Sequence, residues 1–548
     1  MEYDKDKREI KLNRRLNELD KFFLKSQEKQ IEALYRKIQL AYWNAITTGK
    51  KEAYEEYEKA SLEFKKFFNS RENFEYTKKF MGEESGEIAK RQLKLLHDAY
   101  LSSQGDFELL SRIIKISAKV EEAFNLFRAK VRGKEYSANE IEKILKTEKD
   151  SGKLKEFWEA SKKQGELVEK DVLELVKLRN QLAKSLGFDN YYEFSLETNE
   201  QKVEELKKIF SELALKTKIP FEKLKEDIDD FLIKKYNISK NELKPWHYGD
   251  LFFQEGPHIY EIDLDKYYSG DILEKAKKYY QSIGLDVKSI LQNSDLYERK
   301  GKYPHACCMD MDRNGDVRTV QNLKNNEKWM ETLLHELGHA VYSKNFDFSL
   351  PFLLRDNAHI FVTEAIAMLF GRKSKNPEFL RDYSRINEND KEKIKEVTKK
   401  MLKLRQLVFA RWVLVMFNFE RELYKNPEQN LNELWWNLVK KYQLIDFSRN
   451  SPDWASKIHL VAYPVYYHNY MLGELLASQL HNFILKNIIK NNYDSDYSNS
   501  IETGRYLIEN IFKHGAKYRW DELIKKATGE ELKADYFVKE FIETEKRT

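Results

Sequence analysis

Residues 335–339 form the pentapeptide His-Glu-Leu-Gly-His, which matches the pattern H-E-x-x-H. On a helix, a spacing of four residues puts both imidazoles on one face, where two neutral nitrogens can bind the same metal ion. Glu336 directly follows the first histidine, so its carboxylate can reach the attacking water and act as a general base. The pentapeptide therefore predicts metal-dependent hydrolysis of the kind that zinc peptidases perform.

The same pattern can arise by chance in a chain of 548 residues with 11 histidines. Under that alternative, two histidines pack on a helix face beside a structural glutamate. A catalytic zinc site needs a third protein ligand. Glu364 is the best candidate, because enough chain follows His339 for a helix, a turn and a returning helix that presents this carboxylate. Asp347 and Asp356 lie in the expected connection and are weaker candidates. The small residues around Glu364, which suit a crowded metal site, are Thr363, Ala365 and Ala367.

Two helices should position these groups. Residues 327–343 carry apolar side chains at helical spacing around the motif, with Asn325 or Asn326 available as the N-cap. After a turn at Leu350 and Pro351, residues 357–370 show a second amphipathic helical pattern. The two histidines would then lie on the first helix and Glu364 on the second.

A β-hairpin is predicted just before the motif. Residues 304–311 and 317–320 have strand character, and the Asn-Gly pair between them favours a hairpin turn. Residues 310–315 also match the start of a calcium-binding loop, but the twelfth position is Gln321 instead of glutamate. The hairpin is the better interpretation, and it is the one β element that we expect.

These segments resemble a known family. Pro304-His305-Ala306-Cys307-Cys308-Met309-Asp310, the H-E-x-x-H segment and Thr363-Glu364-Ala365-Ile366-Ala367 are similar to the active-site region of the peptidyl-dipeptidase A (angiotensin-converting enzyme) family. Residues 299–303 also resemble the thimet oligopeptidase and oligoendopeptidase family. The likeness covers roughly residues 298–372 and a C-terminal stretch. It implies a gluzincin metallopeptidase with one Zn²⁺ per chain, bound by His335, His339 and Glu364.

The C-terminal likeness consists of Lys457-Ile458-His459, Pro464 and then Tyr467-His468-Asn469-Tyr470. In the dipeptidase family, the equivalent lysine and first tyrosine bind the carboxylate at the end of the substrate. The equivalent histidine and second tyrosine stabilise the oxyanion. The resemblance thus implies substrate binding by Lys457 and Tyr467 and catalysis by His459 and Tyr470 together with Glu336. Such donors suit the negative charge of a tetrahedral intermediate.

An aromatic stripe on a core helix is the alternative interpretation of this tyrosine-rich stretch. We prefer that interpretation for Tyr463 and Tyr466. The alignment needs one extra residue after His459, so Tyr466 is also an alternative to Tyr467.

Further substrate contacts follow from the resemblance. His305 and Ala306 would lie on a strand that pairs with bound peptide through its backbone, which reads an extended chain without reading its side chains. Gln254, in a tract of aromatic and turn-forming residues, could supplement the carboxylate pocket.

The sequence departs from the family at two positions and in its disulfides. Met368 stands where the animal enzymes have an aspartate that orients a ligand histidine, so other contacts must orient that ring. Asn469 replaces an arginine associated with chloride activation, which argues against chloride dependence. The flanking disulfides are absent, and the adjacent Cys307 and Cys308 fit a reducing compartment.

The composition supports a mainly α protein, because only 20 Gly and 9 Pro interrupt 548 residues. The 96 Lys and Arg are interleaved with 91 Asp and Glu, which argues against nucleic-acid and membrane partners. Residues 1–11 are charged and no apolar run could span a bilayer, so we expect a cytoplasmic protein.

The expected fold is one catalytic domain over residues 1–548, with 1–240 as a helical lid and channel wall and 241–548 carrying the zinc site. The resemblance implies a two-lobed helical body with a deep central channel that admits oligopeptides. Removal of C-terminal dipeptides is the favoured activity, and internal cleavage is the alternative. An inactive peptide-binding protein and a helical scaffold with an accidental motif are alternatives from other classes. A monomer is compatible with the sequence.

Overall fold

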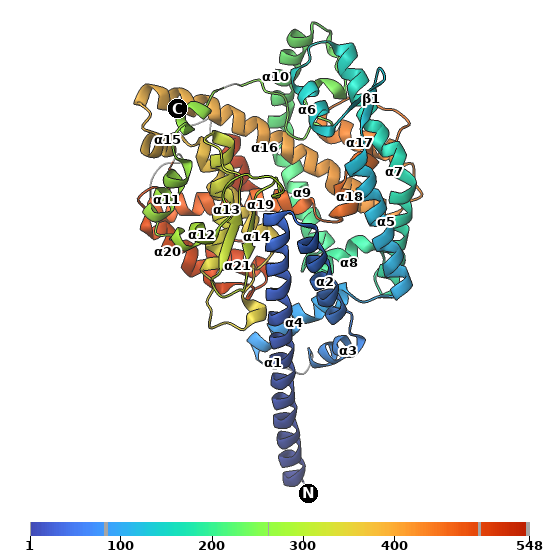
Figure 1. Cartoon of the computed structure of the whole chain (residues 1–548), viewed down its shortest axis with the longest axis vertical. Helices are drawn as coiled ribbons and strands as arrows, with labels where there is room; N and C mark the ends of the chain where they lie inside the picture. The colour runs from blue at the N-terminus through green and yellow to red at the C-terminus, as the bar shows by residue number, and fades with distance from the viewer. Residues whose placement is uncertain (1, 82–85, 261, 491–494, 544–548) are drawn as a thin grey trace. The chain divides into compact units, whose positions relative to one another are not determined.

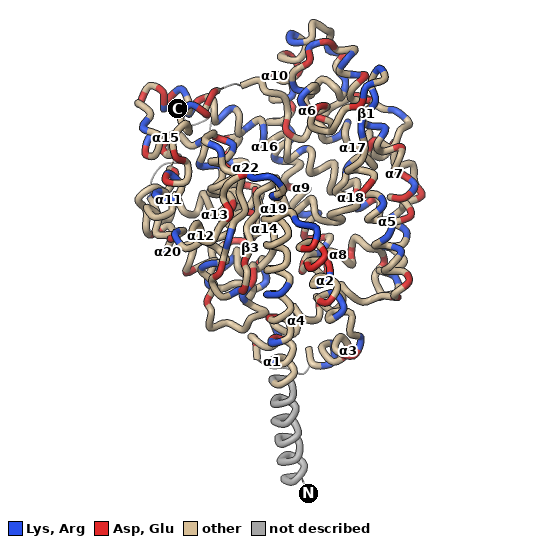
Figure 2. Tube along the Cα trace, in the orientation of Figure 1, with Lys and Arg blue, Asp and Glu red and all other residues tan. Residues whose placement is uncertain are grey.

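The computed structural model describes residues 2–81, 86–260, 262–490 and 495–543 (Figure 1). Met1 and residues 544–548, at the ends of the predicted catalytic domain, lie outside the described residues. Helices dominate, as predicted, and the described part contains two short two-stranded sheets. Figure 2 shows Lys and Arg interspersed with Asp and Glu along the helices, as their order in the sequence predicts. None of the described helices combines the length and apolar character that crossing a membrane requires.

The chain divides into two compact units, each built from three segments. Unit 1 comprises residues 1–104, 264–391 and 476–532, and unit 2 comprises residues 105–263, 392–475 and 533–548. Two of the boundaries fall inside helices, namely α16 (Glu388–Lys425) and α19 (His468–Phe483). The expectation of one catalytic domain with a central channel stays a prediction.

Unit 1 contains the predicted metal-binding segment. Its α-helices are α1 (Glu2–Thr48), α2 (Lys51–Phe68), α3 (Arg71–Phe80), α4 (Glu87–Ser102), α11 (Ile272–Ser282), α12 (Lys288–Asn293), α13 (Glu327–Lys344), α14 (Ile360–Gly371), α15 (Pro377–Ser384), α20 (Ile501–Asn510) and α21 (Trp520–Thr528). Short 3-10 helices, and in one case a π-helix, connect them: η3 (Asp265–Tyr268), η4 (Phe352–Leu354), η5 (Arg372–Lys375), the π-helix η7 (Ile484–Ile489) and η8 (Phe512–His514).

Unit 2 is organised around the long helices α7 (Ser151–Ser185) and α16. Its other helices are α5 (Phe107–Leu126), α6 (Ala138–Thr147), α8 (Tyr191–Thr198), α9 (Val203–Lys216), α10 (Lys218–Tyr236), α17 (Leu431–Gln443), α18 (His459–Ala462) and α22 (Asp535–Phe541). The 3-10 helices are η1 (Lys240–Glu242), η2 (Pro245–His247) and η6 (Asp453–Ser456). Leu109 of α5 packs against Leu178 and Leu182 of α7.

The predicted hairpin is present in unit 1. Strand β3 (Cys307–Asp310) pairs antiparallel with β4 (Val317–Val320). The acidic side chains of its turn accept hydrogen bonds from turn amides: Asp310 Oδ1 from Asp312 and Arg313, and Asp312 Oδ1 from Asn314 and Asp316. These carboxylates therefore close the turn, which explains the calcium-like pattern. The prediction that the first strand starts at residue 304 was wrong, because it starts at Cys307.

A second hairpin, which the sequence analysis did not anticipate, lies in unit 2. Strand β1 (Ala129–Val131) pairs with β2 (Lys134–Tyr136) through a two-residue turn. Arg132 and Gly133 both have positive φ, 51° and 79°, as a type I′ turn requires. The strands are three residues long, too short for an alternating pattern to stand out in the sequence.

Candidate active site

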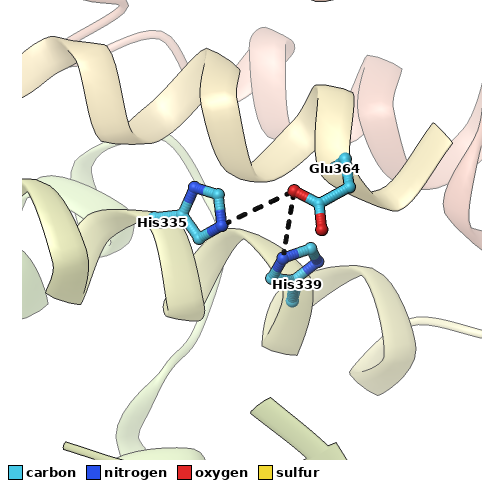
Figure 3. Close-up of side chains that lie close together, drawn as sticks. All are labelled: His335, His339 and Glu364. Carbon is cyan, nitrogen blue, oxygen red and sulfur yellow. Dashed lines mark ion pairs between the residues drawn. The ribbon is translucent and has the colours of Figure 1, made fainter. Parts of the chain in front are cut away.

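Helices α13 and α14 bring the three predicted metal ligands together in unit 1. Asn326 caps α13 by accepting the amide hydrogen of Trp329, and α14 begins at Ile360, slightly later than predicted. The Nε2 atoms of His335 and His339 lie 3.7 and 3.9 Å from Oε2 of Glu364 (Figure 3). The ligand atoms of all three residues lie within 4.8 Å of one another.

This donor set fits a zinc ion. Bonds of about 2.0–2.1 Å in tetrahedral geometry separate ligand atoms by about 3.3 Å, so a small contraction of the cluster would complete the site. Burial lowers the pKa of His335 to about 4 and that of His339 well below its usual value, which keeps both imidazoles in the neutral form that binds metal. Within the described residues, no other group of His, Cys, Asp and Glu side chains is arranged to hold a metal ion.

Thr363 orients the second histidine. Its Oγ1 lies 2.7 Å from Nδ1 of His339. A proton on Nδ1 that donates to this hydroxyl leaves the Nε2 lone pair free to face Glu364. From the sequence, Thr363 was expected only to be a small neighbour of Glu364. Its position immediately before the third ligand was the signal that could have identified it.

Close packing of α13 on α14 sets the spacing between the ligands. A Cβ atom on Gly338 would lie 2.8 Å from Cα of Ala367, so only glycine allows this approach. Gly371, at the end of α14, similarly lies against His335, with 3.3 Å between its ideal Cβ position and Cβ of the histidine.

Glu336 is buried beside the histidines, with 8% of its surface exposed. The backbone N–H of Cys308 in β3 donates a hydrogen bond to its carboxylate. Burial, and secondarily the charge of Glu364, raises the pKa of Glu336 to about 8. A carboxyl group in this environment can both take up and release a proton near neutral pH.

His305 and Ala306 immediately precede β3 instead of lying within it. His305 is exposed and its ring lies 5.3 Å from that of Tyr303, whereas Ala306 is partly buried. At the far end of β3, the hydroxyl of Tyr35 donates to the carbonyl of Asp310. Cys307 and Cys308 are free thiols.

The predicted carboxylate-binding residues meet in unit 2. Nζ of Lys457 donates to Oε1 of Gln254 at 2.8 Å, and it lies 5.0 Å from the ring centroid of Tyr467. Phe252 and Trp412 complete the aromatic surroundings of the ammonium, and Nε1 of Trp412 donates to the Tyr467 hydroxyl. Lys457 is 6% exposed, and burial lowers its pKa to about 8. Local sequence patterns do not predict that Phe252 and Trp412 lie beside this lysine, because only the fold brings them together.

The two predicted oxyanion donors lie on the same segment of unit 2. The ring centroid of His459 lies 4.9 Å from that of Tyr467 and 6.4 Å from that of Tyr470. Burial lowers the pKa of His459 to about 4, so this side chain is neutral at pH 7. The prediction that Tyr463 is a core aromatic was wrong, because 58% of its surface is exposed, while Tyr466 is partly buried against Tyr470.

The chain is similar to known proteins over most of its length. The family model described as angiotensin-converting enzyme matches residues 16–251 and 253–543. The chain belongs to this family. It is 22% identical over 449 residues to the angiotensin-converting enzyme of Haematobia irritans exigua, covering 74% of this chain and 72% of that protein. It is 23% identical over 254 residues to carboxypeptidase 1 of Bacillus subtilis (strain 168), covering 41% of this chain and about half (49%) of that enzyme.

Membership of the angiotensin-converting enzyme family makes the chain a zinc metallopeptidase that acts on peptides. Asn469, one of the two positions where the sequence departs from the animal enzymes, is buried in a hydrogen-bonded network. Its Oδ1 accepts from Nε2 of Gln201 at 2.8 Å, and Oε1 of Gln201 lies 2.8 Å from Nε2 of His468. In this member of the family, the side-chain amide of Asn469 thus stands where the animal enzymes have an arginine.

Proposed function

We propose that this peptidase cleaves oligopeptides with one zinc ion per chain, held by His335, His339 and Glu364. The observation that carries the proposal is the convergence of these three ligand atoms within 4.8 Å, with the buried Glu336 one residue from the first of them. Zinc, when bound, acts as a Lewis acid that polarises the scissile carbonyl and acidifies water.

Different side chains transfer the proton and stabilise the negative charge. Glu336 takes a proton from the attacking water and returns it to the leaving amine, while the amide of Cys308 orients its carboxylate. Tyr470 and the neutral His459 donate hydrogen bonds to the developing oxyanion. His305 and Ala306 hold the peptide through their backbone.

Release of C-terminal dipeptides is the favoured mode. The ammonium of Lys457, supported by Gln254 and Tyr467, offers a buried cation that can pair with the carboxylate at a chain end. Because this charge is already dehydrated and held in place, the interaction should discriminate strongly between a free acid and a neutral end. Internal cleavage, indicated by the thimet-like residues 299–303, is the second candidate.

Glu336→Gln tests the central assignment. We expect the wild-type protein and the variant both to contain about one zinc per chain, measured by metal analysis, while only the wild type cuts a quenched fluorescent peptide library. If both proteins bind zinc and neither cuts any peptide, the chain is a metal-binding and peptide-binding protein without this activity. Cleavage by the variant at the wild-type rate would refute the role of Glu336.

A peptide and its C-terminally amidated twin test the mode of cleavage. An enzyme that reads the chain end should lose most of its activity on the amide, and mass spectrometry should show loss of two residues from the acid. Equal rates on the two peptides, with fragments from internal bonds, would favour the oligoendopeptidase alternative.

We further propose a monomer in the cytoplasm. The adjacent free thiols of Cys307 and Cys308 support a reducing compartment. Sedimentation analysis of the purified protein and fractionation of source cells test the two statements. A stable dimer, or recovery from an extracellular fraction, would contradict them.

A further inference from the structure

The segment of residues 457–470 in unit 2 carries all the side chains proposed to bind the substrate end or the oxyanion there, except Gln254. Lys457 and His459 lie at its start, and Tyr467 and Tyr470 lie at its end. Between them, the chain forms the single turn α18 and a tight bend at Pro464 and Val465. Regular secondary structure cannot fix this bend, so other contacts must determine where the four side chains lie.

A buried arginine holds the first half of the segment. Arg179 of α7 is 5% exposed, and its guanidinium donates to the backbone carbonyls of Leu460 at 3.1 Å and Val461 at 2.8 Å. It also donates to the hydroxyl of Tyr424 on α16. The carbonyls it binds belong to the two residues that directly follow His459.

A buried glutamate holds the second half. Glu420 of α16 is 3% exposed, and its Oε1 accepts the backbone N–H of Val465 at 2.7 Å. Val465 has φ of 54°, a left-handed conformation that β-branched residues rarely adopt. Strain of this kind persists only where surrounding contacts impose it, and it is concentrated at functional sites. The hydrogen bond that the Val465 N–H donates to Glu420 stabilises this backbone conformation.

Packing alone does not explain these two charged residues. Dehydrating a carboxylate and a guanidinium is costly, and apolar side chains of similar size often stabilise a core better. Here Arg179 and Glu420 form hydrogen bonds with the backbone of one irregular segment, and Arg179 also with Tyr424. Such contacts fix the position of a loop, which apolar side chains cannot do as specifically.

We propose that Arg179 and Glu420 are positioning residues that hold the 457–470 segment in its active conformation, so that His459 and Tyr470 stand ready as donors before substrate binds. The inference rests on the function proposed above for those donors. It adds two residues from helices α7 and α16, which have no place in the chemistry itself. Preorganised donors stabilise a transition state without the cost of ordering them during the reaction.

Glu420→Leu and Glu420→Gln form a matched pair that tests the proposal. The amide of glutamine keeps an oxygen that can accept from Val465, whereas leucine keeps only the volume. We expect amide hydrogen exchange within residues 457–470 to become at least about tenfold faster in Glu420→Leu, and kcat to fall about ten- to a hundredfold at full zinc occupancy. Glu420→Gln should stay within about threefold of the wild type in both measurements.

Gln104→Leu in unit 1 controls for loss of stability alone. Gln104 is equally buried and donates to the carbonyls of Phe68 and Tyr100, which also belong to unit 1. This variant should lower the melting temperature and leave kcat unchanged well below it. If Glu420→Leu does not fold, Arg179→Met, which keeps most of the side-chain stem, is measured in the same way.

The outcomes separate this inference from the proposed function. If the wild type cuts no peptide, the proposed function fails, and faster exchange confined to residues 457–470 in Glu420→Leu would still support the positioning role. If Glu420→Leu folds, binds zinc and keeps wild-type kcat, or if Glu420→Gln is as impaired as Glu420→Leu, the positioning role is refuted.

Discussion

His339 illustrates how a single hydroxyl can orient a metal ligand. The animal relatives place an aspartate four residues after the third ligand, but Met368 at that position cannot accept a hydrogen bond of comparable strength. Thr363, one residue before Glu364, lies within hydrogen-bond distance of Nδ1 of His339. In this chain, the residue before the third ligand therefore supplies the orienting contact of His339.

Replacing Thr363 by valine should weaken zinc binding. Valine preserves the shape of the side chain but leaves the N–H of a buried imidazole without an acceptor. We expect a 10- to 100-fold loss of zinc affinity, the range typical for groups that orient metal ligands, measured by competition with a chromophoric chelator. Thr363→Ser should restore most of the affinity. Equal affinity in the wild type and Thr363→Val would show that the hydroxyl has no orienting role.

Lys457 predicts a pH dependence that appears only with free-acid substrates. Burial lowers the pKa of its ammonium to about 8, so the charge is present below that pH and is lost as the pH rises through it. A bound carboxylate favours the charged form. We therefore expect KM for free-acid peptides to rise above about pH 8, while KM for amidated peptides stays flat. Lys457→Met should raise KM for free acids at pH 7 and abolish this pH dependence. A KM profile unchanged by Lys457→Met would contradict the assignment.

Residue-level roles differed in how far the sequence could predict them. The H-E-x-x-H pattern was enough to predict the roles of His335 and His339, because helical spacing alone brings both side chains onto one face. We predicted that Gln254 supplements the carboxylate pocket, but its contact with Lys457 joins residues 203 positions apart. It depends on how α16, η6 and the tract after η2 pack, which no local pattern encodes. The same reason explains why Phe252, Trp412 and Glu420 were not anticipated.

At the scale of elements, the close contact of α13 with α14 determines whether the ligands converge. A glycine inside a helix normally costs about 1 kcal/mol relative to alanine, so Gly338→Ala would be stabilising in open space. Here the added methyl group would lie 2.8 Å from the backbone of Ala367, and α14 would have to move. Glu364 would move with it.

Gly338→Ala should therefore destabilise the protein by about 1–3 kcal/mol, as overpacking usually does, and it should also weaken zinc binding. Urea denaturation of the metal-free protein measures the first effect and chelator competition the second. Gly270→Ala is the control, since its ideal Cβ meets no atom within 4 Å, and it should change stability by less than about 0.5 kcal/mol. Normal stability and affinity in Gly338→Ala would mean that the helices adjust without cost.

Element boundaries were predicted well where local signals are strong. Asn326 caps α13 as one of the two expected residues, and the Asn-Gly turn lies between two real strands. The start of α14 was less accurate, because His359 caps this helix through its imidazole, and histidine is not among the residues usually preferred at that position. The β1–β2 hairpin was missed because its three-residue strands are too short for an alternating pattern to stand out.

At the scale of the whole molecule, the organisation of the chain predicts that zinc stabilises both units. The metal ligands all belong to unit 1, yet the boundaries near residues 391 and 475 fall within α16 and α19. A helix is cooperative along its length, so melting one part of α16 or α19 destabilises the part that belongs to the other unit. This continuity favours one cooperative unfolding transition, consistent with the single catalytic domain expected from the sequence.

Zinc titration during thermal unfolding tests this coupling. Six of the nine tryptophans lie in unit 2, namely Trp158, Trp246, Trp412, Trp435, Trp436 and Trp454. Tryptophan fluorescence therefore reports mainly on the unit without the metal ligands. We expect one transition, with the same midpoint by fluorescence and by circular dichroism. Zinc should move this midpoint to higher temperature. At a free zinc concentration of a thousand times the dissociation constant, the shift should correspond to about 4 kcal/mol of added stability. Glu364→Ala should abolish most of that shift. Two transitions, of which the fluorescence transition ignores zinc, would show that the units unfold independently and that the chain contains two domains.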